Sequence, residues 1–359
     1  MGNPIKVFIV DDSAVVRSIL TERLNAAGGI LVVGSAPDPF IAREKLAKNP
    51  VDVMILDIEM PRMDGLTFLK HLMKSYPIPT IVLSSLVGDH NQASLKALEL
   101  GAVEVLRKPG GPYSVGELLE DLVVKIRMAS LIRMDTLRDL VTRVGANRVA
   151  DAPRRDAGGA KMLAGIRTSR QLIAVGASTG GTIAMEKLFT GFSTDFPPAL
   201  GVIHMPERFT ASFSKRLDDL CLVRVKEAEA GETPLMGHVY IAPGNKHMAI
   251  RMDGAKMAIE IMEGPKVHNQ RPAVDILFRS VARHLGQNGI GVLMTGMGRD
   301  GADGLLQMKE AGAYTITQDE ESCIVYGMPK EAVTLGASMI QLPLDGIAAE
   351  LRRRVAESH

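Results

Sequence analysis

The first part of the chain alternates short apolar runs with amphipathic stretches, a rhythm that predicts a doubly wound α/β domain. The apolar runs are continuous rather than alternating, as expected of parallel strands buried on both faces. The predicted strands are Ile5–Val10, Val53–Leu56, Thr80–Leu83 and Val103–Leu106. From Leu118 to Val144 the apolar residues recur at helical spacing, which predicts a last helix that continues as a linker helix.

A second α/β rhythm begins at Leu172 and predicts another parallel sheet. Within it, Asp253-Gly254 separates two apolar runs, which is a strong hairpin signal. The predicted strands are Leu172–Ala177, Leu200–Ile203, Val239–Ala242, Met248–Met252, Met257–Met262 and Ile290–Thr295. The fold class is therefore α/β, with two doubly wound parallel-sheet domains joined by a linker.

The stretch 145–165 is rich in Ala, Gly, Arg and Asp and has few bulky apolar residues, as is typical of a flexible linker. We therefore expect a first domain over 1–124, a linker helix and flexible linker over 125–165, and a second domain over 166–359. The total of 359 residues is comfortable for two domains.

Composition narrows the function classes. The net charge of +1 gives no electrostatic argument for binding nucleic acid or an anionic membrane. No segment has the apolar length of a membrane span, and the N-terminus lacks a basic-plus-apolar signal segment. The two cysteines, Cys221 and Cys323, form no metal or disulfide pattern, which fits a reducing cytosol. We expect a cytoplasmic protein.

Polar side chains follow each strand of the first predicted sheet. Asp11 and Asp12 follow the first strand, Asp57 the second, Ser84 the third and Lys108 the fourth. Clustered carboxylates repel one another unless a cation lies among them, and Mg²⁺ prefers oxygen ligands. Phosphoryl transfer needs positioning and charge neutralisation more than covalent machinery. Any one of these residues could be an ordinary helix cap, but the whole set at consistent strand ends favours a phosphoryl-accepting site.

With these residues, 4–124 resembles the receiver domain of bacterial two-component response regulators, which has a flavodoxin-like fold. The resemblance implies that Asp57 is the phosphoacceptor. It also implies a Mg²⁺ site at the acidic pair Asp11 and Asp12, with Asp57 and the Glu59 carbonyl as further ligands.

The resemblance further implies that Ser84 and Lys108 couple phosphorylation to the domain surface. One position departs from the family pattern. Receivers usually carry an aromatic residue three positions before the lysine, and this chain has Val105 there. The departure argues against a rotating-aromatic switch but leaves phosphorylation itself unaffected.

The second half places Ser178, His204 and Asp300 after three of its strands. Ser178 lies in a strand-turn-helix setting with glycines, which can expose a hydroxyl near a helix N-terminus. The three residue types suit a nucleophile, a base and an orienting acid, and such triads recur in different chain orders. Each also has a plainer interpretation: a phosphate-binding turn at Ser178, a packed histidine at His204 and a helix cap at Asp300.

Spacing alone does not choose among the acids and histidines of this half. The other candidates are Asp275, Asp303, Asp319, His238, His247, His268 and His284. A resemblance makes the choice: residues 166–356 are similar to the catalytic domain of the chemotaxis protein-glutamate methylesterase family. The matching stretches are Gly176-Ala177-Ser178-Thr179-Gly180-Gly181, His204-Met205-Pro206, Tyr240-Ile241-Ala242-Pro243-Gly244, Arg271-Pro272-Ala273-Val274-Asp275, Thr295-Gly296-Met297-Gly298-Arg299-Asp300-Gly301-Ala302 and Tyr326-Gly327-Met328-Pro329.

This second resemblance implies a Rossmann-like domain with Ser178 as nucleophile, His204 as general base and Asp300 as orienting acid. The Met297 backbone N–H is implied as an oxyanion donor. The implied activity is phosphorylation-activated hydrolysis of glutamyl methyl esters on methyl-accepting chemoreceptors, with release of methanol, and deamidation of receptor glutamines. Mg²⁺ would serve the receiver only, and no cofactor would serve ester hydrolysis.

The implied partners are the chemoreceptors and a chemotaxis histidine kinase as phosphodonor, with recruitment to receptor arrays and no nucleic acid or membrane insertion. We expect the unphosphorylated receiver to cover the esterase site. Two alternatives belong to other classes. One is a phosphorylation-switched receptor-binding adaptor with little catalysis. The other is a DNA-binding regulator, for which the second half is too long, too neutral and too rich in strands.

Overall fold

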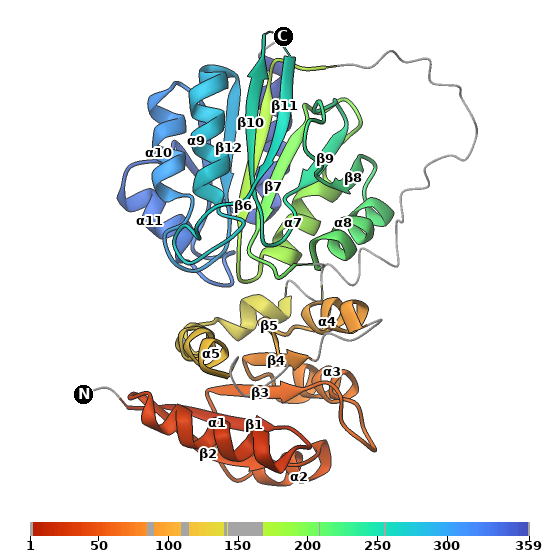
Figure 1. The fold of residues 1–359 in the computed structure, drawn as a ribbon, viewed down its shortest axis with the longest axis vertical. Coiled ribbons are helices and arrows are strands. Elements are labelled where there is room, and N and C mark those ends of the chain that lie inside the picture. The colour runs from red at the N-terminus through yellow and green to blue at the C-terminus, as the bar shows by residue number, and fades with distance from the viewer. Residues whose placement is uncertain are drawn as a thin grey trace. The chain divides into compact units, whose positions relative to one another are not determined.

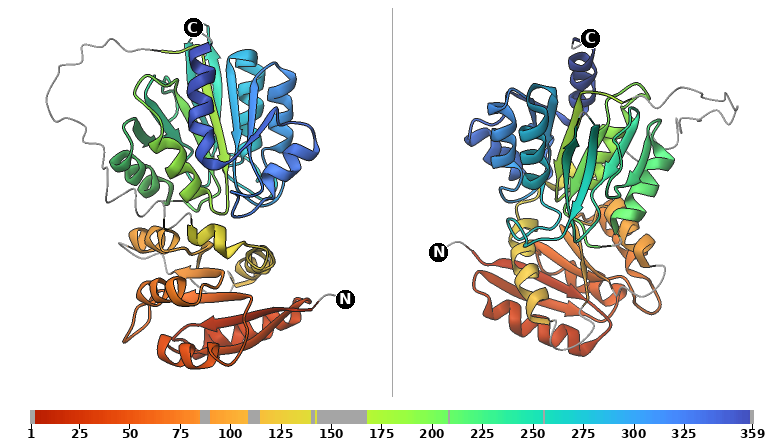
Figure 2. Two further views of the ribbon diagram at one scale, coloured as in Figure 1. Left: turned by 180° about the vertical axis from the view of Figure 1, so that it is seen from behind. Right: turned by 45° about the horizontal axis from the view of Figure 1, so that its top comes forward.

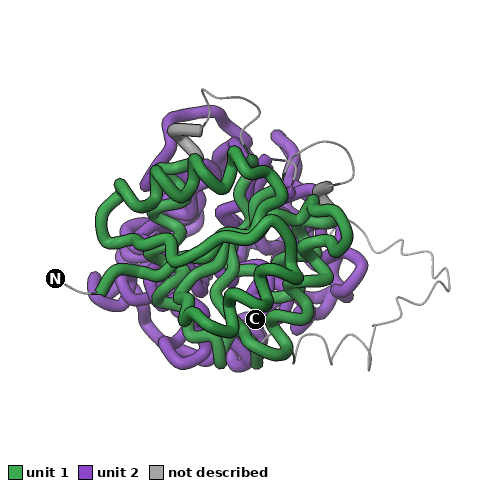
Figure 3. The backbone as a smooth tube through the Cα atoms, turned by 90° about the horizontal axis from the view of Figure 1, so that it is seen from below, with its two compact units in different colours: residues 1–142 green, residues 143–359 purple. Residues whose placement is uncertain are grey.

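The structure is a computed structural model that describes residues 3–84, 90–108, 115–139, 142, 168–207, 209–254 and 256–357. The predicted flexible linker over 145–165 lies outside the described residues. The chain divides into two compact units, residues 1–142 and 143–359 (Figure 3). Within the described part, no helix combines the length and apolar character needed to cross a membrane.

Unit 1 is a parallel five-stranded sheet in the order β2-β1-β3-β4-β5 (Figure 1). Its strands are β1 Ile5–Val10, β2 Ile30–Ala36, β3 Val53–Asp57, β4 Thr80–Ser84 and β5 Glu104–Arg107. The helices that follow these strands in turn are α1 Ala14–Ala26, α2 Pro39–Leu46, α3 Gly65–Ser75, α4 His90–Glu99 and α5 Val115–Ala129. This strand order is that of flavodoxin-like domains.

Short polar residues start three of these helices. Ser13, Asp38 and Asp64 each accept a hydrogen bond from a backbone N–H in the first turn of α1, α2 and α3, respectively. Such caps satisfy amides that have no partner inside the helix. The starts of these three helices are therefore set by local chemistry.

The predicted continuous helix over Leu118–Val144 is wrong in one respect. Helix α5 ends at Ala129, residues 130–133 are not helical, and helix resumes only over 134–139. The break lets Ile132 and Leu137 be buried, whereas Leu131, just before Ile132, is 75% exposed. One straight helix could not have directed both apolar side chains into the core.

Unit 2 contains a parallel seven-stranded sheet in the order β14-β13-β12-β6-β7-β9-β8. Its strands are β6 Leu172–Ala177, β7 Ala199–Ile203, β8 Arg224–Glu227, β9 His238–Ile241, β12 Gly289–Leu293, β13 Tyr314–Gln318 and β14 Ile340–Leu342. The predicted hairpin is confirmed as a separate antiparallel pair, β10 His247–Asp253 and β11 Lys256–Met262. The helices are α7 Gly181–Thr190, α8 Phe209–Leu220, α9 Val274–Leu285, α10 Ala302–Glu310, α11 Met328–Thr334 and α12 Leu344–Glu357.

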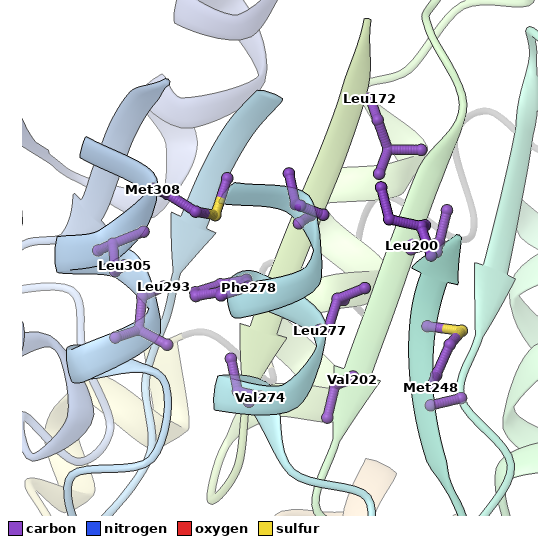
Figure 4. Packing of buried hydrophobic residues seen from close by; sticks show 14 of the residues in the cluster. Leu172, Leu200, Val202, Met248, Val274, Leu277, Phe278, Leu293, Leu305 and Met308 are labelled. Atoms are coloured by element: carbon purple, nitrogen blue, oxygen red, sulfur yellow. The ribbon is translucent and has the colours of Figure 1, made fainter. Parts of the chain in front are cut away.

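Helices cover both faces of the second sheet. Helices α9, α10 and α11 and the hairpin lie over one face, and α7, α8 and α12 lie over the other (Figures 1 and 2). Helix α9 fills the centre of the first layer: Phe278 packs toward Leu293 of β12, and Leu277 lies on the side of Val202 of β7 (Figure 4). Phe278 and Leu277 are both fully buried, so α9 is firmly seated against the strands that carry the site.

Candidate functional sites

The first candidate site lies where β1 and β3 run side by side. The chain leaves these two strands toward opposite edges of the sheet, because β2 lies beyond β1 and β4 lies beyond β3. Open α/β sheets bind ligands in the crevice at such a switch point. Asp11 directly follows β1, and Asp57 ends β3, so the topology alone brings these carboxylates to the crevice.

Lys108 joins the two buried carboxylates. Its Nζ lies 2.9 Å from Asp11 Oδ2 and 2.7 Å from Asp57 Oδ2, and each acid is 1% exposed. Burial raises the pKa of Asp57 to about 6, with Asp11 adding to the rise and Lys108 opposing it. Burial lowers the pKa of Lys108, but its bonds to the two acids outweigh burial and leave that pKa raised.

The residues of this cluster fit a divalent cation. Carboxylate oxygens of Asp11, Asp12 and Asp57 lie within 4.8 Å of one another, and Asp12 is exposed. One lysine against three acids leaves an excess of negative charge, and oxygen ligands are those that Mg²⁺ prefers. Glu59 is adjacent, since its N–H donates to Asp57 Oδ1 at 3.2 Å, and its carbonyl stays a predicted ligand.

Ser84 and Lys108 are also brought together, since the Lys108 N–H donates to the Ser84 carbonyl at 2.9 Å. The Ser84 hydroxyl is buried and has no hydrogen-bond partner among the described residues, so it can donate a hydrogen bond to the oxygen of a bound group. Val105 is 3% exposed on β5. Its aliphatic side chain is thus packed into the sheet rather than presented at the surface.

The second candidate site lies at the carboxyl ends of β7, β6 and β12, which are neighbours in the middle of the second sheet. Ala177 pairs with Ile203 in register, so Ser178 and His204 leave adjacent strands at the same level. The His204 N–H donates to the Ala177 carbonyl at 3.3 Å. Because β7 and β13 lie on opposite sides of the β6–β12 pair, this edge is again a topological switch point.

Ser178 sits in a tight turn that ends at α7. Its N–H donates to the Thr295 carbonyl at 3.0 Å, and its carbonyl accepts from the Gly181 N–H at 2.7 Å. Gly180 adopts a φ of 78°, a left-handed conformation that favours glycine. The turn places a side chain that is 9% exposed just before the N-terminus of α7, where the helix dipole favours negative charge.

His204 pairs with Asp300. The His204 Nε2 and Asp300 Oδ2 atoms are 2.8 Å apart, and the other ring nitrogen is buried without a hydrogen-bond partner among the described residues. Asp300 Oδ2 also accepts from the Val274 N–H (2.7 Å), and Oδ1 accepts from the Asp275 N–H (3.0 Å). Burial raises the pKa of Asp300, but His204 and these two amides outweigh it and hold that pKa below its usual value.

Asp275 in turn stabilises the loop that carries Asp300. Its carboxylate is completely buried, and Oδ1 accepts from the N–H groups of Gly301 (3.1 Å) and Gly304 (2.7 Å) at the start of α10. The N-terminal amides of α9 therefore bind the Asp300 carboxylate, which lies just before α10. The N-terminal amides of α10 in turn bind the Asp275 carboxylate of α9. We call this arrangement the α9–α10 clasp. Asp275 Oδ2 also pairs with two cationic or titratable side chains, His268 (3.0 Å) and Arg279 (3.3 Å).

The loop before Asp300 passes close to the serine. A Cβ atom at Gly296 would lie 2.8 Å from Ser178 Cβ, so only glycine permits this approach. The next residue is Met297, and its N–H donates to no acceptor within the described part of the chain. A free amide one residue from the serine contact is available to an incoming oxyanion.

Among the described residues, Asp300 is the acid that contacts His204, and the other acids considered from sequence are engaged elsewhere. Asp303 pairs with Arg299, and Asp319 accepts from Ser322. Sequence reasoning did not single out Asp275 or Thr295. Both lie inside the matching motifs, but their buried hydrogen bonds reach residues distant in sequence, so no local pattern reveals them.

Comparison with known families matches both halves. Residues 173–351 match the model of the CheB methylesterase family, and residues 7–120 match that of the response regulator receiver domain. A protein-glutamate methylesterase/protein-glutamine glutaminase of Syntrophus aciditrophicus is 51% identical over 98% of this chain and 99% of its own length. One from Bdellovibrio bacteriovorus is 45% identical over 99% of this chain and 98% of its own.

A solved structure agrees for the second half. The crystal structure of the Thermotoga maritima CheB methylesterase catalytic domain is 36% identical, with a TM-score of 0.51. It covers 52% of this chain and 100% of that domain. The α/β fold class with parallel sheets, expected from the apolar pattern, is confirmed.

Proposed function

Because this chain belongs to the CheB methylesterase family and carries an N-terminal receiver domain, we propose that it is a phosphorylation-activated protein-glutamate methylesterase. The reaction hydrolyses glutamyl methyl esters of chemoreceptors to glutamate and methanol, and the corresponding glutamine reaction releases ammonia. The observation that carries the chemistry is the buried His204–Asp300 pair beside Ser178 at the switch point. Family membership over nearly the full chain speaks for an enzyme rather than for an adaptor.

Ser178 is the nucleophile in this proposal. The ring nitrogen of His204 that Asp300 leaves free accepts the hydroxyl proton as Oγ attacks the ester carbonyl. The resulting oxyanion is stabilised by the Met297 N–H and by the N-terminus of α7. His204 then gives its proton to the departing methoxide, and methanol leaves a glutamyl-enzyme. Water, deprotonated by the same histidine, releases the glutamate.

Asp300 orients and stabilises the imidazolium in both half-reactions. Its low pKa keeps it ionised, so a negative charge faces His204 when the ring gains its proton. The serine, histidine and carboxylate supply nucleophile, base and charge stabilisation, so we propose that ester hydrolysis uses no cofactor.

The receiver supplies the regulation. Asp57 is the proposed phosphoacceptor, and Asp11, Asp12, Asp57 and the Glu59 carbonyl are the residues that would hold Mg²⁺. When bound, Mg²⁺ neutralises charge on the phosphoryl group. Lys108 and the free Ser84 hydroxyl would contact the phosphoryl oxygens and carry the change to the surface. The proposed phosphodonor is a chemotaxis histidine kinase, and the proposed location is the cytoplasmic side of chemoreceptor arrays.

The test is methanol release from methylated chemoreceptor membranes. Wild type and Ser178→Ala are each assayed with and without a small-molecule phosphodonor and Mg²⁺. We expect release that rises with phosphodonor in wild type and is lost in the variant. Absence of methanol release from wild type under every condition would contradict the esterase proposal. A receptor-binding adaptor would then be the remaining interpretation.

A further inference from the structure

Thr295, just past the end of β12, is 1% exposed and connects three separate segments. Its carbonyl accepts from the Ser178 N–H at 3.0 Å, and its hydroxyl lies 3.0 Å from the Thr179 carbonyl, to which it donates. The same hydroxyl accepts from the Val325 N–H at 3.0 Å. The Thr295 N–H in turn donates to Gln318 Oε1 at 2.8 Å.

Two of these hydrogen bonds hold the backbone of the serine turn, one at Ser178 and one at Thr179. One bond reaches the amide of Ser178 itself, and the other reaches the carbonyl of Thr179. Thr295 is also two residues before Met297, whose N–H is the proposed oxyanion donor. One residue therefore sets the separation between the serine oxygen and that amide.

Thr295 is itself held by the neighbouring strand. Gln318, the last residue of β13, is fully buried, and its Nε2 donates to the Ser322 carbonyl at 2.8 Å, which fixes the side-chain amide. On the far side, the Gly296 N–H donates to the Val325 carbonyl at 3.1 Å. The position of the Thr295 backbone is thus determined from two directions before any substrate arrives.

We propose that Thr295 is a positioning residue that aligns Ser178 with the Met297 oxyanion donor. This inference rests on the proposed esterase function. Among the described residues, Thr295 forms no hydrogen bond with the Ser178 hydroxyl or with His204. Its contribution should therefore be felt in the transition state, where the oxyanion forms, and not in substrate binding. The expected signature is a fall in kcat with KM nearly unchanged.

The chain offers a matched control at Thr315. Its hydroxyl is also completely buried, donates to the Ala337 carbonyl at 2.7 Å and accepts from the Met339 N–H at 3.2 Å. It is the second residue of β13, near the strand's N-terminal end and so away from the edge that carries Ser178. Replacing either threonine by valine removes hydroxyl hydrogen bonds to backbone carbonyl and N–H groups at nearly constant volume, but only Thr295 is next to the nucleophile.

The experiment measures kcat and KM for methanol release by the full-length protein with phosphodonor, together with the thermal unfolding midpoint. We expect Thr295→Val to lower kcat about 10- to 100-fold with KM within about twofold. This is less than the roughly 100- to 1,000-fold loss on removing an oxyanion donor outright, because the donor is displaced and not deleted. Thr295→Ser, which retains the hydroxyl, should stay within about threefold of wild-type kcat. Thr315→Val should lower the midpoint but leave kcat unchanged.

Thr295→Val with unchanged kcat and a lowered midpoint would overturn the proposal, because the residue would then be merely structural. If Thr295→Val does not fold, Gln318→Met removes the acceptor of the Thr295 N–H and should lower kcat about 3- to 10-fold; an unchanged kcat overturns the proposal equally. Failure of the esterase function itself is distinguishable, since wild type would then release no methanol.

Discussion

Two buried aspartates show how local partners decide a carboxylate's charge. Asp57 and Asp300 are each 1% exposed, yet the pKa of Asp57 is raised to about 6 and that of Asp300 is lowered. Asp300 accepts two amides from the start of α9 in addition to its bond to His204. For Asp57, burial and the like charge of Asp11 outweigh the opposing effects of Lys108 and of one amide.

Asp300→Asn should make this difference visible as a pH-dependent loss of stability. A carboxylate whose folded pKa is lowered stabilises the fold fully above its unfolded pKa, near 3.9, and loses that contribution as the pH falls through the folded value. We expect the variant to be about 1–3 kcal/mol less stable at pH 7, with the gap narrowing below about pH 4. Since the chain has no tryptophan, urea unfolding followed by circular dichroism is the measurement. A gap that is constant with pH would contradict the assignment.

The acidic cluster of the receiver should bind Mg²⁺ without a phosphodonor. Relief of repulsion among Asp11, Asp12 and Asp57 should raise the free energy of unfolding of wild type by about 1.4 kcal/mol at tenfold excess over the dissociation constant, and with it the unfolding midpoint. Asp57→Asn removes one acid and should weaken the effect. Calorimetry with Mg²⁺ and with chelator checks this expectation, and equal shifts in both proteins would argue against the site.

At the scale of elements, the α9–α10 clasp joins two helices that contribute different parts of the site. Helix α9 supplies the amides that hold Asp300, and Asp275 near the start of α9 holds the first turn of α10. The loop that carries Asp300 is therefore fixed by two helix N-termini at once. Neither helix can shift along its axis without breaking a buried charged hydrogen bond.

Asp275→Ala should reveal the strength of the clasp. It leaves the amides of Gly301 and Gly304 buried without an acceptor, and we expect a loss of about 2–4 kcal/mol in the free energy of unfolding. Asp275→Asn, which keeps an acceptor oxygen, should lose less. Asp219→Ala, at an exposed position on α8, is the control and should change stability by under about 0.5 kcal/mol. Equal losses for Ala and Asn would mean that the amides are not what the side chain stabilises.

The apolar pattern predicted the strands that are continuously hydrophobic and missed those that are not. Strands β2, β8, β13 and β14 went unpredicted. Strand β2 ends in Gly34-Ser35-Ala36, β8 is a polar edge strand, β13 is rich in threonine and β14 has only three residues. The positions of the candidate site residues at strand ends followed from sequence. The residues that hold them in place did not, because the contacts of Asp275 and Thr295 depend on the packed tertiary structure.

For the whole molecule, phosphorylation in one unit should change activity in the other. We expect Asp57→Asn to bring the ratio of methanol release with and without phosphodonor to about one, because no phosphoryl group can shift the population toward the active enzyme. Ser178→Ala should still incorporate radiolabelled phosphate while releasing no methanol. Phosphodonor activation that persists in Asp57→Asn would move the phosphoacceptor elsewhere.

The central position of β6 in its sheet should determine how rarely the strand before Ser178 opens to solvent. With β12 and β7 paired along its two edges and helices over both faces, β6 has no frayed side through which water can reach its amides. Its amide hydrogens should exchange with deuterium only when the whole unit unfolds, whereas those of edge strands β8 and β14 should exchange through local opening. Ser178 directly follows the strand that we expect to exchange most slowly in its unit, so the proposed nucleophile should keep its position even while the edges of the sheet open and close.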